Sequence, residues 1–218
     1  MSQLNLWKRG LGAVPDEVWD DFGLESLVLA DNGLTAVSER LGRLARLRML
    51  DLGHNRLEAL PDAIGELAGL TDFLYLHDNR LTSLPAALAR LVRLRYLNIG
   101  ENPLGALPAP VLALTGLVEL RAEACGLAEL PDGIGRLVRL RELALRDNRI
   151  AALPESMGAL TELRALDLRQ NPITLLPDAL VALPRLEKLD LRWTPIAADG
   201  ADGARLARLE ARGVRVYR

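Results

Sequence analysis

The stretch LRMLDLGHNRLEALPDAIGELAG, residues 47–69, contains one complete unit of a pattern that recurs along the chain. The pattern is LxxLxLxxNxLxxLPxxIGxLxx, and a half copy precedes the first full one. Further copies begin at Leu24, Thr71, Leu94, Leu117, Leu140, Leu163 and Leu186. The asparagine position returns every 23 residues, apart from one step of 24 between Asn55 and Asn79. Such a period indicates a stack of small units that bury their apolar side chains against their neighbours.

The alternating leucines of each LxxLxL segment predict a short strand with one buried face. The proline that follows, as at Pro61 and Pro85, interrupts the strand and starts a turn or short helix on the other side. Neighbouring strands lie about 4.8 Å apart, and the outer segments need more room, so the stack must curve. The sequence therefore predicts a right-handed α/β solenoid, an arc with a parallel sheet on its concave face and short helices or turns on its convex face.

A single domain accounts for the whole chain. We expect a half repeat and cap over residues 1–23, eight repeats over 24–196 with the last one modified, and a C-terminal cap over 197–218. Terminal units need caps because an open array exposes leucine to water. At the N-terminal end, Trp19 and Phe22 are expected to close the core.

The C-terminal cap is predicted to consist of a helix and an edge strand. Asp199 or Asp202 stands where it could cap the helix, and Gly213 is placed to end it. Val214 and Val216 then add the strand. The acidic residues here are interpreted as capping groups rather than as a metal loop, and caps at both ends favour a complete array over a fragment.

The composition limits the class of function. Acidic residues number 29 and basic residues 27, so the net charge of −2 offers no broad basic field for nucleic acid or an anionic membrane. A lone cysteine excludes an internal disulfide, which favours a reducing compartment and hence the cytoplasm. No segment looks like a secretory signal, and none approaches the ~20 apolar residues of a membrane span. These features predict a soluble cytoplasmic protein.

With these motifs the chain resembles the leucine-rich repeat family in its 23-residue form, over nearly its whole length. Intracellular repeat proteins grouped with Ras-pathway scaffolds are similar, as are bacterial repeat-only arrays. The resemblance implies a protein-binding scaffold without a cofactor, active in signalling, either monomeric or a weak homodimer. One alternative that it implies is a regulator that docks on a small GTPase or another signalling enzyme. Because the repeats are very regular, a further alternative is an engineered chain with no native partner.

The asparagine column has a structural interpretation. A buried amide can hydrogen-bond the backbone of the turn that leaves each strand, which would otherwise be unsatisfied. Cys125 stands in the same column, so we expect its thiol to be a buried weak donor rather than a nucleophile.

The register of the leucines fixes which side chains face the hollow. Three of the eight aromatic residues, Phe73, Tyr75 and Tyr96, fall on that face beside Met49, with His77 next along the chain. These four residues, Met49, Phe73, Tyr75 and Tyr96, are called the aromatic group below. Exposed rings are the usual anchors of a protein interface, although they could also merely cover one another. The 24-residue step occurs here and predicts a bulge, which would weaken the hypothesis if it turned Phe73 inward.

A second feature of that face is a row of basic residues toward the C-terminal end. This arginine strip consists of Arg121, Arg146, Arg169, Arg192 and the neighbouring Trp193. Arginines at strand spacing repel one another unless acids or a ligand offset their charge. Asp167 and Asp190 could provide that offset. The other interpretation is a docking strip for acidic side chains of a partner.

Evidence for an enzyme is slight. Asp31, His54, Asp78 and Glu101 form one column with His77 beside it, and such groups could hold a metal or act as acid and base. An open sheet, however, lacks the enclosure of catalytic sites. No GxxxxGK[ST], GxSxG, HExxH or paired CxxC motif occurs. The sequence favours a non-catalytic module whose concave sheet binds another protein, with a metal or catalytic site on the Asp31, His54 and Asp78 ladder as a second alternative.

Overall fold

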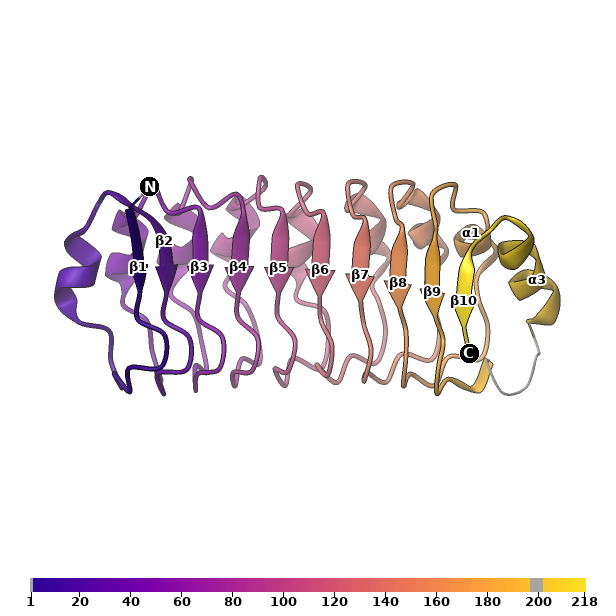
Figure 1. Cartoon of the computed structure of the whole chain (residues 1–218), viewed down its shortest axis with the longest axis horizontal. Coiled ribbons are helices and arrows are strands. Elements are labelled where there is room, and N and C mark those ends of the chain that lie inside the picture. Colours follow the sequence, from indigo (N-terminus) through magenta and orange to yellow (C-terminus); the bar gives the residue numbers. More distant parts are fainter. Residues whose placement is uncertain (1, 197–201) are drawn as a thin grey trace.

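The computed structural model describes residues 2–196 and 202–218. In these residues, ten parallel strands pair in chain order to form one open sheet. Figure 1 shows the strands side by side on one face of the molecule, with most helices behind them and a helical segment beyond each end of the sheet. The strands are β1 (Ser2–Asn5), β2 (Leu24–Val28), β3 (Met49–Asp51), β4 (Phe73–Tyr75), β5 (Tyr96–Asn98), β6 (Glu119–Arg121), β7 (Glu142–Ala144), β8 (Ala165–Asp167), β9 (Lys188–Asp190) and β10 (Arg215–Tyr217). The predicted curved solenoid with a parallel sheet is confirmed.

Short helices occupy the convex side, as the sequence predicts. The 3-10 helices are η1 (Asp16–Asp20), η2 (Glu39–Arg43), η3 (Asp62–Glu66), η4 (Ala86–Arg90), η5 (Ala109–Ala113), η6 (Asp132–Arg136) and η7 (Glu155–Ala159), and the α-helices are α1 (Asp178–Val181) and α3 (Gly203–Ala211). The repeated proline stands directly before a helix, for example Pro61 before η3 and Pro177 before α1. Its fixed φ and missing N–H suit that position.

The core is one continuous column of leucines behind the sheet. Leu50, Leu74 and Leu97 pair directly across β3, β4 and β5, and each is fully buried. Burying one such side chain contributes roughly 1.5–3 kcal/mol. The outward side chains of these strands are therefore not needed to complete the core.

The buried asparagines hydrogen-bond the turn that leaves each strand, as predicted, and they also connect successive units. The Asn55 amide donates to the carbonyls of Leu29, Leu52 and Gly53 at 3.0–3.1 Å. Its oxygen accepts from the N–H groups of Asn32 and Leu34 at 3.1 and 3.0 Å. Each asparagine thus satisfies the backbone of its own turn and of the preceding unit.

Cys125 takes the asparagine position in its own unit and is 1% exposed. Its thiol lies 3.3 Å from the carbonyl oxygens of Ile99 and Glu123, to which it donates. Burial raises the pKa of this thiol to about 11. The expectation of a buried weak donor is confirmed.

The unit that contains β4 begins at Leu70 rather than at Thr71. Leu70 is 1% exposed and its N–H donates to the carbonyl of Leu67, as Leu47 does to Leu44. The extra residue of the 24-residue step therefore lies between Leu70 and Phe73, outside the strand. The sequence pattern placed the start of this unit at Thr71 because Thr71, and not Leu70, stands 23 residues before Leu94.

The hydrogen bonds beside β4 show how the extra residue is accommodated. The N–H groups of Arg95 and Tyr96 donate to two different carbonyls, those of Thr71 and Asp72, at 3.0 and 3.1 Å. One unit later the equivalent N–H groups, of residues 118 and 119, both donate to the carbonyl of Arg95. The bulge precedes the strand, so β4 stays in register with its neighbours and Phe73 faces outward.

The N-terminal cap is partly as predicted. Trp19 is 1% exposed and closes the core together with Val18 of η1. The prediction for Phe22 is wrong, because this ring is 57% exposed. Since η1 already turns Val18 and Trp19 inward, Phe22 in the following turn lies at the surface.

The C-terminal cap has the predicted helix and strand. Gly213, with φ +86°, ends α3, and β10 adds to the sheet beside β9. Asp202 precedes α3, but its side chain does not cap the helix. The carboxylate instead accepts from the N–H of Leu176 and from Arg205. Asp199 lies outside the described residues.

Among the residues that the structure describes, no helix has the length and apolar character needed to cross a membrane.

Candidate functional site

The rings of the aromatic group lie together on the sheet face that carries no helices. Phe73 pairs with Tyr96 across β4 and β5, and Met49 pairs with Phe73 across β3 and β4. The ring centroids are 4.9 Å apart for Tyr75 and Tyr96, and 5.5 Å for Phe73 and Tyr96. The structure therefore brings the predicted residues into one cluster.

The cluster is partly covered by its own members and partly open. Phe73 is 43% exposed, whereas Tyr75 and Tyr96 are half-buried. Burial raises the pKa of Tyr96 to about 12 and shifts the pKa of Tyr75 in the same direction. Both phenols stay neutral at physiological pH and present a hydroxyl as well as an apolar ring.

His77 extends the cluster toward the C-terminal ends of the strands. Its ring centroid lies 6.2 Å from that of Tyr75 and 4.6 Å from that of His54. The pKa of His77 is lowered mainly by burial and, to a smaller extent, by the nearby His54. Gly53 makes room for this imidazole, since an added Cβ there would lie 2.5 Å from it. Sequence reasoning missed this glycine, although its place between Ala30 and His77 in one column was a usable signal.

The arginine strip is largely neutralised by its own acids. Arg169 binds the Asp167 carboxylate, with the shortest contact at 2.6 Å, and Arg192 binds Asp190 in the same way at 2.7 Å. Arg121 likewise lies 2.6 Å from Glu119. Each pair joins residues two apart on one strand face, which is why the charges can meet. The simpler interpretation, in which acids offset the strip, accounts for these three arginines.

Arg146 differs from the rest of the strip. Its closest carboxylate oxygen among the described residues, on Asp147, is 3.7 Å from Nε, and this nitrogen is buried without a hydrogen-bond partner. The small side chains of Ala144 and Ala165 leave a hollow of about 290 Å³ in front of it. At the far end, Trp193 is 67% exposed and Arg192 lies over its ring. Arg146 and Trp193 are therefore the members best placed to contact another molecule.

The polar ladder has a conformational role that the sequence did not reveal. Asp31, His54, Asp78 and Glu101 all have φ between 51° and 58°, in the left-handed region. Aspartate, asparagine and histidine enter this region more readily than other non-glycine residues. The turn after each strand requires that conformation, so the column reflects backbone geometry.

The ladder does not converge on a metal site. His54 lies 2.7 Å from Asp78 and 3.2 Å from His77, whereas Asp31 is 3.7 Å from Lys8 instead. Within the described ranges, no group of three or more histidine, cysteine, aspartate or glutamate side chains is arranged to hold a metal ion.

Several solved structures are similar to this chain. A leucine-rich repeat protein of Leptospira interrogans is 23% identical with a TM-score of 0.77, over 98% of this chain and 64% of that one. The ectodomain of the Arabidopsis thaliana receptor kinase GASSHO1/SCHENGEN3, in complex with CASPARIAN STRIP INTEGRITY FACTOR 2, is 29% identical with a TM-score of 0.74, over 89% and 24%. The plant peptide hormone receptor RGFR1, in complex with RGF2, is 29% identical with a TM-score of 0.65, over 84% and 34%. This chain spans less than two thirds of the length of each.

The sequence comparisons gave a match to a family model. Curated protein sequences include no significant match. The leucine rich repeat model matches residues 22–74 and 138–196, which together make up just over half of the chain. With ten parallel strands, a buried asparagine column and this match, the chain belongs to the leucine-rich repeat family.

Proposed function

We propose that this chain is a non-catalytic interaction module that binds another protein through its concave sheet, with the aromatic group as the main anchor. The observation that carries the proposal is the cluster of Phe73, Tyr75 and Tyr96 on a face whose buried side is already filled by leucine. Folding does not require rings at these positions. A partner that covers them would remove a large apolar area from water.

The physical chemistry of the cluster suits such an anchor. One aromatic side chain buries on the order of 150–250 Å² at an interface, and few such residues usually supply most of the affinity. The rings are already ordered against one another, so binding loses little side-chain entropy. Arg146 and Trp193 are proposed as the second contact, because the Nε of Arg146 is buried without a hydrogen-bond partner and the Trp193 ring is largely exposed.

The similar plant receptor structures support a protein or peptide as the partner. Both were solved with a bound partner, CASPARIAN STRIP INTEGRITY FACTOR 2 in one and RGF2 in the other. A small GTPase or another signalling enzyme would be one kind of partner for an intracellular array. A cytoplasmic location and a monomeric or weakly dimeric state belong to the same proposal.

Affinity capture from the native cell, followed by mass spectrometry, tests the proposal. The chain with Tyr75→Ala and Tyr96→Ala is compared with the unaltered chain and with a Phe22→Ala control. Phe22 is a more exposed ring than either tyrosine, but it lies in the N-terminal turn outside the sheet. A reproducible set of proteins that is lost only from the double variant supports the anchor. The same set captured by all three chains contradicts it.

A further inference from the structure

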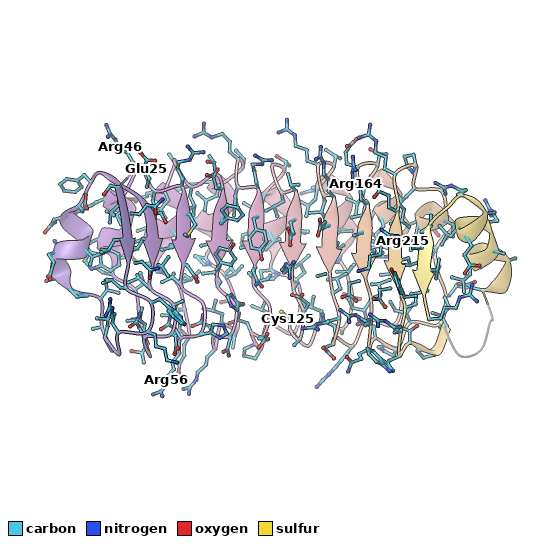
Figure 2. The ribbon with its side chains drawn as sticks, viewed as in Figure 1. Glu25, Arg46, Arg56, Cys125, Arg164 and Arg215 are labelled. Atoms are coloured by element: carbon cyan, nitrogen blue, oxygen red, sulfur yellow. The ribbon has the colours of Figure 1, made fainter. Side chains whose placement is uncertain are left out.

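The loops that lead from the convex helices into the strands carry repeated arginines. In three units a buried leucine is flanked by two arginines, as Arg46 and Arg48, Arg93 and Arg95, and Arg139 and Arg141. The leucine points into the core, so the arginines point away from it. Figure 2 shows Arg46 and Arg164 along this edge of the sheet, and Arg56 on the opposite edge. One edge of the solenoid is therefore lined with guanidinium groups.

The unit between the second and third arginine pairs lacks these long side chains. Its loop has Gly116 and Val118 where the neighbouring units have arginine. A Cβ at Gly116 would lie 2.5 Å from the carbonyl oxygen of Val92, so only glycine allows the two loops to approach this closely. The loop with the short side chains lies between two loops with long arginine side chains, and a hollow of about 970 Å³ is left between them at the edge of the sheet.

Both cationic and apolar side chains line this hollow. We call it the arginine notch, and its arginines are Arg93, Arg95, Arg139 and Arg141. Val92 and Val138 line it and are 49% and 48% exposed. No ion pair involves any of the four arginines in the part of the chain that the structure describes. The lining carboxylate, Glu162, is held by Arg185.

The unit that stands two before that of Gly116 offers an internal comparison. Gly69 makes the same close approach, with an added Cβ 2.5 Å from the carbonyl of Ala45, and it also lies between two arginine pairs. There, however, Asp72 binds Arg48 at 3.0 Å. In that gap a carboxylate of the chain thus pairs with a flanking arginine, whereas Glu162 of the arginine notch pairs with Arg185 instead. Arginines without an ion-pair partner indicate a ligand that carries carboxylates.

We propose that the arginine notch binds an acidic, extended segment of a partner protein. Carboxylates of the segment would lie between the two arginine pairs, where guanidinium groups can bind them through two parallel hydrogen bonds. Apolar side chains beside them would cover the exposed valines. Valines offer no platform on which nucleic-acid bases could stack, which favours a peptide.

The arginine notch is continuous with the aromatic group. Arg95 and Val118 also line a second hollow, of about 390 Å³, whose other members include Phe73 and Tyr96. A segment that crosses the sheet edge would therefore reach both sites. This inference adds a contact to the proposed function, and its test does not depend on the native partner.

A binding assay with a synthetic probe tests the arginine notch. The probe is a short fluorescein-labelled peptide of glutamate and leucine, and binding is followed by fluorescence anisotropy at low salt. The Arg139→Glu/Arg141→Glu variant is expected to bind the probe about tenfold more weakly, because two favourable charge pairs become repulsive. Added salt should weaken binding to the unaltered chain.

A matched control removes the general effect of charge. The Arg56→Glu/Arg149→Glu variant has the same net charge as the notch variant. Both of its residues directly follow a member of the asparagine column, on the opposite edge of the sheet. This variant should bind the probe as tightly as the unaltered chain does. The Tyr75→Ala/Tyr96→Ala chain should also bind it as tightly, and this result would separate the test of the arginine notch from the test of the aromatic anchor. Equal binding by the notch variant, an equal loss in either of the other variants, or tighter binding of a single-stranded oligonucleotide than of the peptide would overturn the proposal.

Discussion

Tyr75 and Tyr96 lie with their ring centroids 4.9 Å apart at an interplanar angle of 46°, on two adjacent strands of the concave sheet. The contact comes from the register of β4 and β5, which an extra residue in the preceding loop leaves intact. Two tyrosines are thereby fixed next to a more exposed phenylalanine. This arrangement is the physical basis of the proposed anchor, and it separates binding from folding.

Replacing both tyrosines should leave the fold nearly as stable as before. Leu74 and Leu97, which pair behind them, are fully buried and remain in place. The Tyr75→Ala/Tyr96→Ala chain should lose no more than about 1 kcal/mol of unfolding free energy, as surface changes usually do. Urea denaturation followed by circular dichroism measures this value. A loss of several kcal/mol would mean that the rings belong to the core.

The asparagine column should be much more sensitive. Asn55→Ala removes a side chain that makes five hydrogen bonds to buried backbone groups. Each unsatisfied buried group costs about 1–3 kcal/mol, so the variant should lose at least about 3 kcal/mol of unfolding free energy. Asn55→Cys should lose less, because Cys125 fills the same position with a thiol that donates to two carbonyls. Equal losses for alanine and cysteine in urea titrations would contradict this account of the column.

Gly116 and Gly203 should respond oppositely to alanine. At Gly116 the new Cβ would press on a backbone carbonyl 2.5 Å away, so Gly116→Ala should cost about 1–3 kcal/mol. At Gly203, the first residue of α3, nothing lies within 4 Å of the added Cβ. Gly203→Ala should be neutral or stabilise by up to about 1 kcal/mol. Thermal unfolding of the two single variants, side by side, checks the contrast.

The buried thiol predicts a pH dependence of stability. The pKa of Cys125 is about 11 in the folded chain, against an ordinary value of 9.0. Between these values the unfolded chain loses the proton first, so the unfolding free energy falls as pH rises from about 9 to 11. Below the lower value the thiol contributes no slope. In Cys125→Ala the decline over this window should be shallower, and an unchanged slope in denaturation at stepped pH values would reject the assignment.

Much of the fold could be predicted from the sequence because its physical signals are local and repeated. The leucine spacing gave the strands, the concave face and the position of Tyr75 and Tyr96, and the asparagine spacing gave the hydrogen-bonded column. Leu70 was misassigned because the pattern tolerated Thr71 as the first residue of a unit. Phe22 was misplaced because two other side chains already close that end of the core.

The remaining features depend on contacts between units, which a single repeat does not encode. The left-handed turn at His54 and its equivalents became apparent only from backbone angles. The pairing of Arg169 with Asp167 required the geometry of one strand face. The arginine notch did have a sequence signal, since TGLVEL stands between VRLRYL and VRLREL, but its depth comes from the close approach of Gly116 to Val92.

The affinity of a captured partner for three purified chains tests the central claim most directly. Isothermal titration calorimetry would compare the unaltered chain, Tyr75→Ala/Tyr96→Ala and Phe22→Ala. An aromatic anchor contributes about 2 kcal/mol or more, and the two tyrosines act together as one anchor, so the double variant should bind at least about thirtyfold more weakly. Phe22→Ala should match the unaltered chain. Equal affinity for all three chains would contradict the claim that the concave aromatic group anchors the partner.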